Sequence, residues 1–212
     1  STPSRDILKL YKELGGKIIT IGSDSHKPEH LGAYIDEAKE LSKGYKVVPI
    51  SMEIMSDIRT PMQVLRILKG VSSHCYMLES VENQEKWGRY TFLGYDPKLE
   101  ITCTNGVMTV KNGKTKVSEV KHPGEKLKEI LKEYTSPKIK EHPTYTGGLV
   151  GYFSYDYIKY SEPKLNLDAN DEEGFKDVDL MLFDKVIAFD NFSQKIIVIA
   201  NARTENLRED YD

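Results

Sequence analysis

Two Asn-Gly dipeptides, at residues 105–106 and 112–113, constrain the fold more tightly than any other feature of this sequence. They separate three short segments with many β-branched residues, "LEITCT", "VMTVK" and "KTKVSEV". Asn-Gly suits the type I′ turn of a two-residue β-hairpin, because both of its residues take positive φ. The spacing therefore predicts an antiparallel meander over residues 98–120.

Before the meander, the sequence predicts an edge strand, a helix and a hairpin. "KVVPISMEI" is extended in pattern, and Pro49 favours an edge or irregular strand because proline donates no ladder hydrogen bond. A capping box that starts at Thr60, with proline at the first helical position, opens a helix that Gly70 ends. Strands are expected over residues 74–81 and 90–95, joined by a polar loop.

After the meander, a helix is expected from about Pro123 to Tyr134, with its apolar residues on one face. "GGLVGYFSYDYI" predicts a strand that leads into a helical turn. "DLMLFDKVIAFD" and "KIIVIAN" predict a long hairpin around residues 191–194. Strands thus dominate from about residue 46 onward, which indicates an α+β body with a largely antiparallel sheet and flanking helices.

The first 45 residues follow a different pattern. "PSRDILKLYKEL" reads as a helix, "KIITIG" as a short buried strand and residues 29–42 as a second helix. This helix-strand-helix fragment is of the α/β type, in which ligands bind at the carboxyl ends of strands. Asp24 and His26 lie just after the strand, where a carboxylate and an imidazole could face one metal ion. The alternative is that the two residues cap the following helix or a turn.

Composition excludes several classes of protein. The 212 residues are 39% hydrophobic and 30% charged, with a formal net charge of -3, so neither nucleic acid nor an acidic membrane surface is an expected partner. Cys75 and Cys103 lack CxxC spacing, so no zinc ribbon or disulfide framework is indicated. No apolar run is long enough to cross a membrane, and we expect a cytoplasmic protein.

Residues 1–40 resemble the C-terminal end of a histidinol-phosphatase of the polymerase-and-histidinol-phosphatase (PHP) superfamily. The resemblance rests on "GSDSH" and "PEHLG". In that family the first motif carries two metal ligands, which here would be Asp24 and His26. The family's other ligands, an N-terminal His-x-His and a middle His and Glu, have no counterpart in this chain. The resemblance therefore implies an orphan half-site that stays empty, and a unit over residues 1–45.

From about residue 41 to 212 the chain resembles the N-terminal half of anthranilate synthase component I. The segments that carry this are "VVPISMEIMSDIRTPMQVLRIL", "CYMLESVENQEKWGRYTFLGYDP", "GGLVGYFSYDYIKY" and "DVDLMLFDKVIAFDN". The aminodeoxychorismate synthase component shares them in weaker form and is the alternative. The resemblance implies a second unit over residues 46–212. It also implies a lyase that converts chorismate to anthranilate in tryptophan biosynthesis, assisted by a glutamine amidotransferase subunit.

The same resemblance implies a tryptophan feedback site at the Leu-Glu-Ser strand. A zwitterionic amino acid needs an acceptor for its ammonium group and donors for its carboxylate. Glu79, Ser80 and Arg89 offer such groups within one hairpin. The alternative is structural: Glu79 and Arg89 would form a cross-strand ion pair, and Ser80 would end a strand.

The sequence therefore leaves three candidate functions for this chain. The first is a regulatory, tryptophan-binding part of an anthranilate synthase large subunit that is not catalytically competent alone. Its family places chorismate and Mg²⁺ in the C-terminal half, so no cofactor is expected in this chain. The second is a non-functional fragment of a metal-dependent phosphatase fused to that part. The third is a structural module whose sheet pairs with other sequence.

Overall fold

The structure is a computed structural model that describes residues 43–57, 59–79, 88–140, 142–162, 164–165 and 171–206. The expected helix-strand-helix unit, with Asp24 and His26, lies outside these residues, as does most of the 1–45 segment. That unit and the boundary near residue 45 therefore remain predictions.

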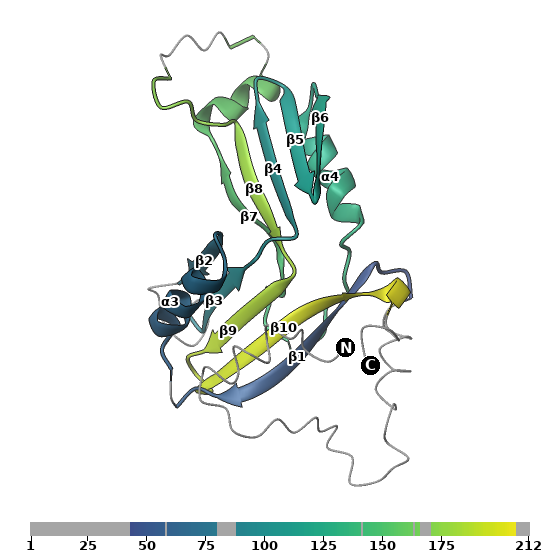
Figure 1. Cartoon of the computed structure of the whole chain (residues 1–212). Helices are drawn as coiled ribbons and strands as arrows, with labels where there is room; N and C mark the ends of the chain where they lie inside the picture. Colours follow the sequence, from purple (N-terminus) through teal and green to yellow (C-terminus); the bar gives the residue numbers. More distant parts are fainter. Residues whose placement is uncertain are drawn as a thin grey trace.

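Two five-stranded antiparallel sheets make up the described part of the chain (Figure 1). The first sheet has the strand order β1 (Val47–Met55), β10 (Lys195–Arg203), β9 (Lys185–Asp190), β3 (Tyr90–Tyr95), β2 (Cys75–Leu78). The second has the order β6 (Lys114–Glu119), β5 (Val107–Asn112), β4 (Leu99–Thr104), β8 (Val178–Phe183), β7 (Gly148–Phe153). This confirms the predicted α+β class with a largely antiparallel arrangement, and it divides the strands between two sheets.

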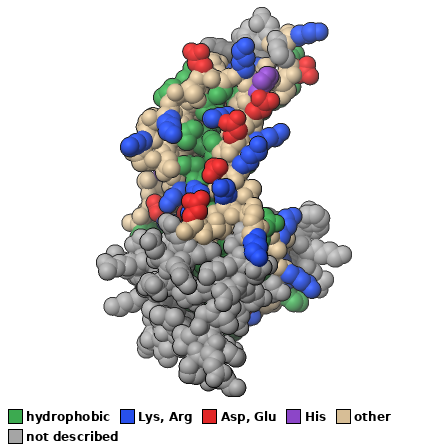
Figure 2. Space-filling view, turned by 90° about the vertical axis from the view of Figure 1, so that its right-hand side faces the viewer, with side chains coloured by type: hydrophobic (Ala, Val, Ile, Leu, Met, Phe, Trp, Pro, Cys, Tyr) green, Lys and Arg blue, Asp and Glu red, His purple; other side chains and the backbone are tan. Residues whose placement is uncertain are grey.

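An α-helix covers each sheet on one side, and the described residues also include short 3-10 helices. α3 (Pro61–Val71) packs against the first sheet through Val64 and Leu68, both fully buried. α4 (Pro123–Lys132) packs against the second sheet through Leu127. The 3-10 helices are η2 (Tyr155–Tyr160) and η3 (Thr204–Asn206). Figure 2 looks onto the side where α4 and β6 lie and shows basic and acidic side chains interspersed over it.

The predicted capping box is confirmed at the start of α3. The Thr60 side chain accepts a hydrogen bond from the Gln63 amide at 3.3 Å, and the Gln63 side chain accepts one from the Thr60 amide at 3.1 Å. These bonds satisfy two amides that the first helical turn leaves without partners. The helix ends at Val71, one residue beyond the predicted Gly70.

Continuous segments of chain join the two sheets, which the sequence patterns did not predict. β3 leads into β4 through residues 96–98, and β8 leads into β9 through Asp184 alone. Phe183 still pairs with Gly148 of the second sheet, whereas the Asp184 carbonyl accepts a hydrogen bond from the Asn201 amide of β10 at 2.9 Å. The expected long hairpin around residues 191–194 is therefore confirmed only for β9 and β10. β8 belongs to the second sheet, where it lies between β4 and β7.

The predicted meander is confirmed as β4, β5 and β6, all antiparallel. At the first turn Asn105 and Gly106 have φ of 49° and 78°, the two positive values that a type I′ turn requires. The second turn differs, because Asn112 pairs with Lys114 and only Gly113 between them has a positive φ, 64°.

Two glycine-to-alanine changes test whether this backbone conformation contributes to stability. Gly113→Ala is expected to lower the free energy of unfolding by about 1 kcal/mol, because a side chain disfavours positive φ. Gly70→Ala in α3 is the matched control and should raise it by about 0.5–1 kcal/mol, because alanine suits a helix. A Cβ at either position meets no atom within 4 Å, so conformation alone distinguishes them. Urea unfolding measures both, and equal effects of the two changes would contradict the turn assignment.

Candidate functional site

Two of the three predicted ligand-binding residues, Glu79 and Arg89, lie at one end of the β2–β3 hairpin. Leu78 at the end of β2 pairs with Phe92 of β3. Glu79 follows β2 immediately and is exposed, and Arg89 immediately precedes β3. Ser80 lies outside the described residues. The sheet therefore brings Glu79 and Arg89 to the same end of two paired strands.

Arg89 binds Asp190 at the end of β9. Its Nη2 donates to Asp190 Oδ2 at 2.6 Å, and its Nε lies 3.1 Å and 3.2 Å from the two carboxylate oxygens. The Asp190 side chain is only 4% exposed, whereas that of Arg89 is 40% exposed. The guanidinium also lies 5.0 Å from the centre of the Tyr90 ring and 5.9 Å from that of Phe192. This geometry fixes Arg89 in place and leaves its side chain partly exposed.

Asp190 also organises the turn between β9 and β10. Its Oδ1 accepts hydrogen bonds from the amides of Phe192 at 3.1 Å and Ser193 at 3.0 Å. The Asn191 amide donates to the Arg89 carbonyl at 2.8 Å, so the turn is bound to β3 as well. Burial is the largest influence on the pKa of Asp190 and raises it, but the hydrogen bonds from Arg89 and Ser193 together hold the pKa below its usual range.

This pKa predicts how stability depends on pH. A carboxyl group whose pKa is lower in the folded state stabilises the fold above its unfolded pKa of about 4, and this contribution is lost as pH falls through the folded pKa. Arg89→Met removes the guanidinium, so we expect the variant to be less stable than the natural chain at neutral pH. The difference should shrink as the pH falls below about 4. Urea midpoints measured over this range check the sign, and a difference independent of pH would contradict it.

Aromatic side chains form a group that extends along β3 and β2, from Tyr90 next to Arg89 to Tyr76 opposite Gly94, and the sequence patterns do not predict this group. The Tyr76 hydroxyl donates to the Tyr145 hydroxyl at 3.1 Å. Three ring pairs are in contact: Tyr76–Phe183 at 4.7 Å, Phe92–Tyr145 at 5.3 Å and Tyr90–Phe92 at 5.6 Å between centroids. Burial, and then the neighbouring Tyr145, raise the pKa of Tyr76, so its hydroxyl keeps its proton. The cluster offers an apolar surface next to charged groups.

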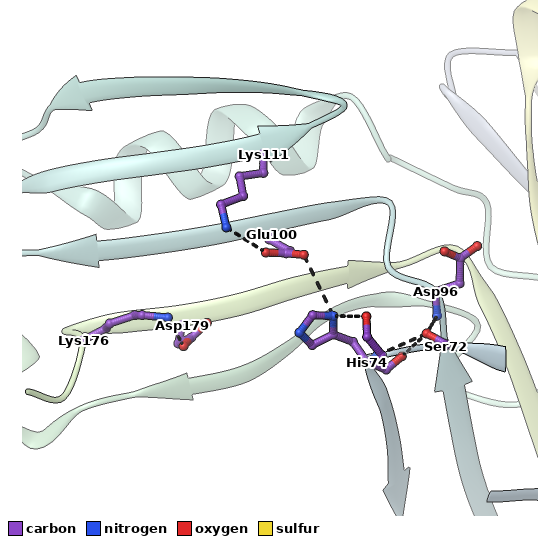
Figure 3. Close-up of polar contacts among 8 residues, drawn as sticks. Ser72, His74, Asp96, Glu100, Lys111, Lys176 and Asp179 are labelled. Atoms are coloured by element: carbon purple, nitrogen blue, oxygen red, sulfur yellow. Dashed lines mark hydrogen bonds and ion pairs between the residues drawn. The ribbon is translucent and has the colours of Figure 1, made fainter. Parts of the chain in front are cut away.

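A second polar cluster lies where the two sheets meet (Figure 3). His74 Nδ1 is 3.9 Å from Glu100 Oε1 on β4, and the other Glu100 oxygen accepts a hydrogen bond from Lys111 Nζ at 3.4 Å. Ser72 Oγ donates to the His74 carbonyl at 2.7 Å and accepts from the Asp96 amide at 3.0 Å. These contacts connect the start of β2 to the chain segment that enters β4.

The described part of the chain contains no cluster of metal ligands. No three His, Cys, Asp or Glu side chains come close enough together there to hold a metal ion. The polar groups of these residues therefore do not fit a Mg²⁺ site. None of the described helices has the length and apolar character to cross a membrane.

The sequence of this chain is similar to a known protein family and to known proteins. Residues 73–211 match the family model described as chorismate binding enzyme. The chain is 33% identical over 168 residues to anthranilate synthase component 1 of Acetivibrio thermocellus, covering 79% of this chain and 34% of the relative. It is 32% identical over 185 residues to anthranilate synthase component 1 of Aquifex aeolicus, covering 86% of this chain and 37% of the relative.

Among the solved structures to which this chain is similar is the crystal structure of anthranilate synthase component I from Streptococcus pneumoniae TIGR4. The identity is 26%, the coverage 74% of this chain and 34% of that chain, and the TM-score 0.44. This chain thus spans about a third of the length of the relatives that it matches. Glu79, Ser80 and Arg89 all lie within the residues that the family model matches.

Proposed function

The chain belongs to the chorismate binding enzyme family, and from this premise we propose that it is the tryptophan-binding, regulatory segment of an anthranilate synthase large subunit. Such a subunit converts chorismate to anthranilate. The observation that carries the proposal is the position of Glu79 and Arg89 at one end of the hairpin that contains "LES" and "RYTFLG". The names of the relatives favour anthranilate synthase over the aminodeoxychorismate synthase component.

Tryptophan suits the groups at this hairpin end. Glu79 is an exposed carboxylate that could accept hydrogen bonds from the ligand ammonium group. The Ser80 hydroxyl and the accessible side of Arg89 would donate to the ligand carboxylate. The aromatic cluster of Tyr90 and Phe92 supplies an apolar surface next to Arg89. An amphipathic aromatic amino acid is therefore the ligand class that these groups fit.

The contribution of Arg89 is limited by its partner. Asp190 already neutralises the guanidinium through hydrogen bonds of 3.1 Å and 2.6 Å. A ligand carboxylate would therefore meet a pair with no net charge, and its attraction to Arg89 would be weaker than to a lone arginine. Glu79 and Ser80 then have the larger share in binding, and Arg89 mainly defines the wall of the site.

Substrate binding, metal binding and the supply of ammonia would depend on other parts of the enzyme. Chorismate and Mg²⁺ would be held by residues outside 43–206, and a glutamine amidotransferase subunit would supply ammonia. The PHP-like segment, residues 1–45 with Asp24 and His26, would have no phosphatase activity, because two ligands are too few for a hydrolytic metal centre.

Tryptophan inhibition tests the proposed function. A relative of full length, in which residues 46–206 replace the corresponding third, should form anthranilate and be inhibited by tryptophan. Indole is the matched control ligand and should not inhibit, because it lacks the ammonium and carboxylate groups that Glu79, Ser80 and Arg89 recognise. A hybrid that forms anthranilate but is insensitive to tryptophan would overturn the regulatory assignment.

The 212-residue chain itself is expected to form no anthranilate from chorismate, Mg²⁺ and ammonia. Proton transfer, metal coordination and binding of the substrate carboxylates need groups that are positioned together. Anthranilate fluorescence measures the product, with the unmodified full-length relative as positive control. Sustained turnover that a mutation within residues 43–206 abolishes would contradict this expectation.

A further inference from the structure

Two basic side chains beside the proposed site, Arg89 and Lys195, are each paired with a carboxylate. Tyr90, Asp190 and Lys195 lie directly opposite one another on β3, β9 and β10, so their side chains project from the same face of the first sheet. Arg89 binds Asp190 at this face, and Lys195 Nζ donates to Glu53 Oε2 on β1 at 2.6 Å. This face therefore presents two ion pairs next to the site.

The two ion pairs differ in how their charges are exposed. Lys195 and Glu53 are both largely exposed, so water screens both members of that pair. In the other pair the Asp190 carboxylate is buried and the Arg89 side chain is partly exposed. A ligand therefore meets the cationic member, with the carboxylate 2.6 Å behind it. Two opposite charges at this separation act on a ligand nearly as a neutral dipole.

The protonation states of these groups are fixed at neutral pH. Burial raises the pKa of Asp190, but the hydrogen bonds that it accepts hold this pKa below its usual range, so the carboxylate stays ionised. Burial also raises the pKa of the Tyr90 hydroxyl; Arg89 opposes this, and Asp190 and Glu53 add to it, so Tyr90 stays neutral. A ligand at this hairpin end therefore meets the exposed Glu79 carboxylate and an arginine whose charge is balanced.

We propose that the Arg89–Asp190 pair sets the charge selectivity of the tryptophan site, so that the site accepts an aromatic ligand with an ammonium group and rejects a ligand that carries only carboxylates. This inference rests on the proposed function. A lone arginine at this position would attract a cyclic carboxylate. Chorismate, the substrate of the proposed subunit, is such a ligand, because it has carboxylates and no ammonium group. Neutralising Arg89 would keep the substrate from occupying the inhibitory site.

Two analogues of tryptophan test this selectivity without any variant. Tryptamine keeps the ammonium group and lacks the carboxylate, whereas indole-3-propionate keeps the carboxylate and lacks the ammonium group. In the full-length hybrid that carries residues 46–206, tryptophan should inhibit most strongly, then tryptamine, then indole-3-propionate. The inhibition constants of the two analogues should differ by about tenfold or more. Inhibition by indole-3-propionate that equals or exceeds that by tryptamine overturns the proposal.

Asp190→Asn tests the role of the pair itself. Asparagine keeps a side-chain oxygen that can accept from the Phe192 and Ser193 amides, but it leaves the Arg89 charge without its counterion. Indole-3-propionate should then inhibit about tenfold more strongly, and tryptamine more weakly. Tryptophan should change least, because its carboxylate is attracted more strongly and its ammonium group is repelled.

Asp179→Asn is the matched control for charge. It removes one carboxylate from the ion pair with Lys176 at the second sheet and should leave all three inhibition constants unchanged. If Asp190→Asn shifts the two analogues no more than Asp179→Asn does, the pair does not set selectivity and the proposal is overturned. If Asp190→Asn does not fold, the comparison of the two analogues in the natural hybrid decides alone. A natural hybrid that tryptophan itself fails to inhibit overturns the proposed function, and this inference with it.

Discussion

Replacing Asp177 with alanine is expected to lower the free energy of unfolding by about 3 kcal/mol. The Asp177 carboxylate is almost fully buried just before β8. It accepts hydrogen bonds from the Asn105 amide and the Tyr160 hydroxyl, both at 2.7 Å, and pairs with Lys159 Nζ at 2.7 Å. It thereby connects η2 to the first turn of the meander. Burial acts most strongly on its pKa and raises it, but Lys159, Tyr160 and Asn105 together lower it.

The size of this effect follows from what the change leaves behind. Removing one partner of a buried ion pair costs about 3–5 kcal/mol. Lys159 is 27% exposed and can be partly solvated in the variant, which favours the lower end of that range. The Asn105 amide and the Tyr160 hydroxyl would lose their acceptor. For a chain of this size the melting temperature should fall by about 6–12 °C.

Asp179→Ala is the matched control for this prediction. Asp179 lies two residues further along, in β8, and binds Lys176 at 2.7 Å, a pair visible in Figure 3. Lys176 is 44% exposed, so the pair resembles a surface ion pair and its loss should cost below about 1 kcal/mol. Thermal unfolding measures both variants. If Asp177→Ala costs no more than Asp179→Ala, the buried network does not stabilise the meander.

Local sequence patterns predicted local structure well. The Thr60 capping box depends on residues three apart, and the Asn105–Gly106 turn on two neighbours, so each acts through contacts within a few residues. The division into two sheets was not predicted, because it depends on the chain leaving β7 after Phe183 and beginning to bond to β10 at Asp184. No short pattern records such a choice of partner.

The same limit applies to the candidate site. The resemblance to a known family identified Glu79, Ser80 and Arg89, and the structure places the first and third at one hairpin end. The partner of Arg89 is 101 positions away, and nothing in the sequence near either residue indicates the pair. "DNFSQ" predicted a turn at residues 191–194, but not that Asp190 would both hold this turn and bind Arg89.

Asp190 therefore changes how the proposed tryptophan site is expected to work. The sequence allows two roles for Arg89: it would help to define the ligand pocket together with Ser80, or it would pair with Glu79 across the strands. Its hydrogen bonds with Asp190 leave Glu79 available as an exposed acceptor and reduce the net charge that Arg89 presents. The main donors and acceptors for the ligand would then be Ser80 and Glu79, so changes at Ser80 should have the larger effect on regulation.

Ser80→Leu in the full-length hybrid subunit is expected to abolish tryptophan inhibition while anthranilate synthesis persists. A lost hydrogen bond to a charged group costs about 1.5–3 kcal/mol, or about one to two factors of ten in affinity. The leucine side chain adds bulk where the ligand carboxylate would lie, so the total loss should reach about a hundredfold or more. Chorismate chemistry is assigned to residues outside this segment and should be little affected.

Ser80→Ala separates the lost hydrogen bond from the obstruction. It removes the hydroxyl without adding bulk, so its tryptophan inhibition constant should rise by about ten- to a hundredfold and lie between those of the natural sequence and Ser80→Leu. Initial rates of anthranilate formation over a tryptophan titration give both constants. If Ser80→Leu loses synthesis and inhibition together, Ser80 is a packing residue. If both variants remain fully sensitive, tryptophan binds elsewhere, and the exposed Glu79 and the neutralised Arg89 belong to the scaffold of the first sheet.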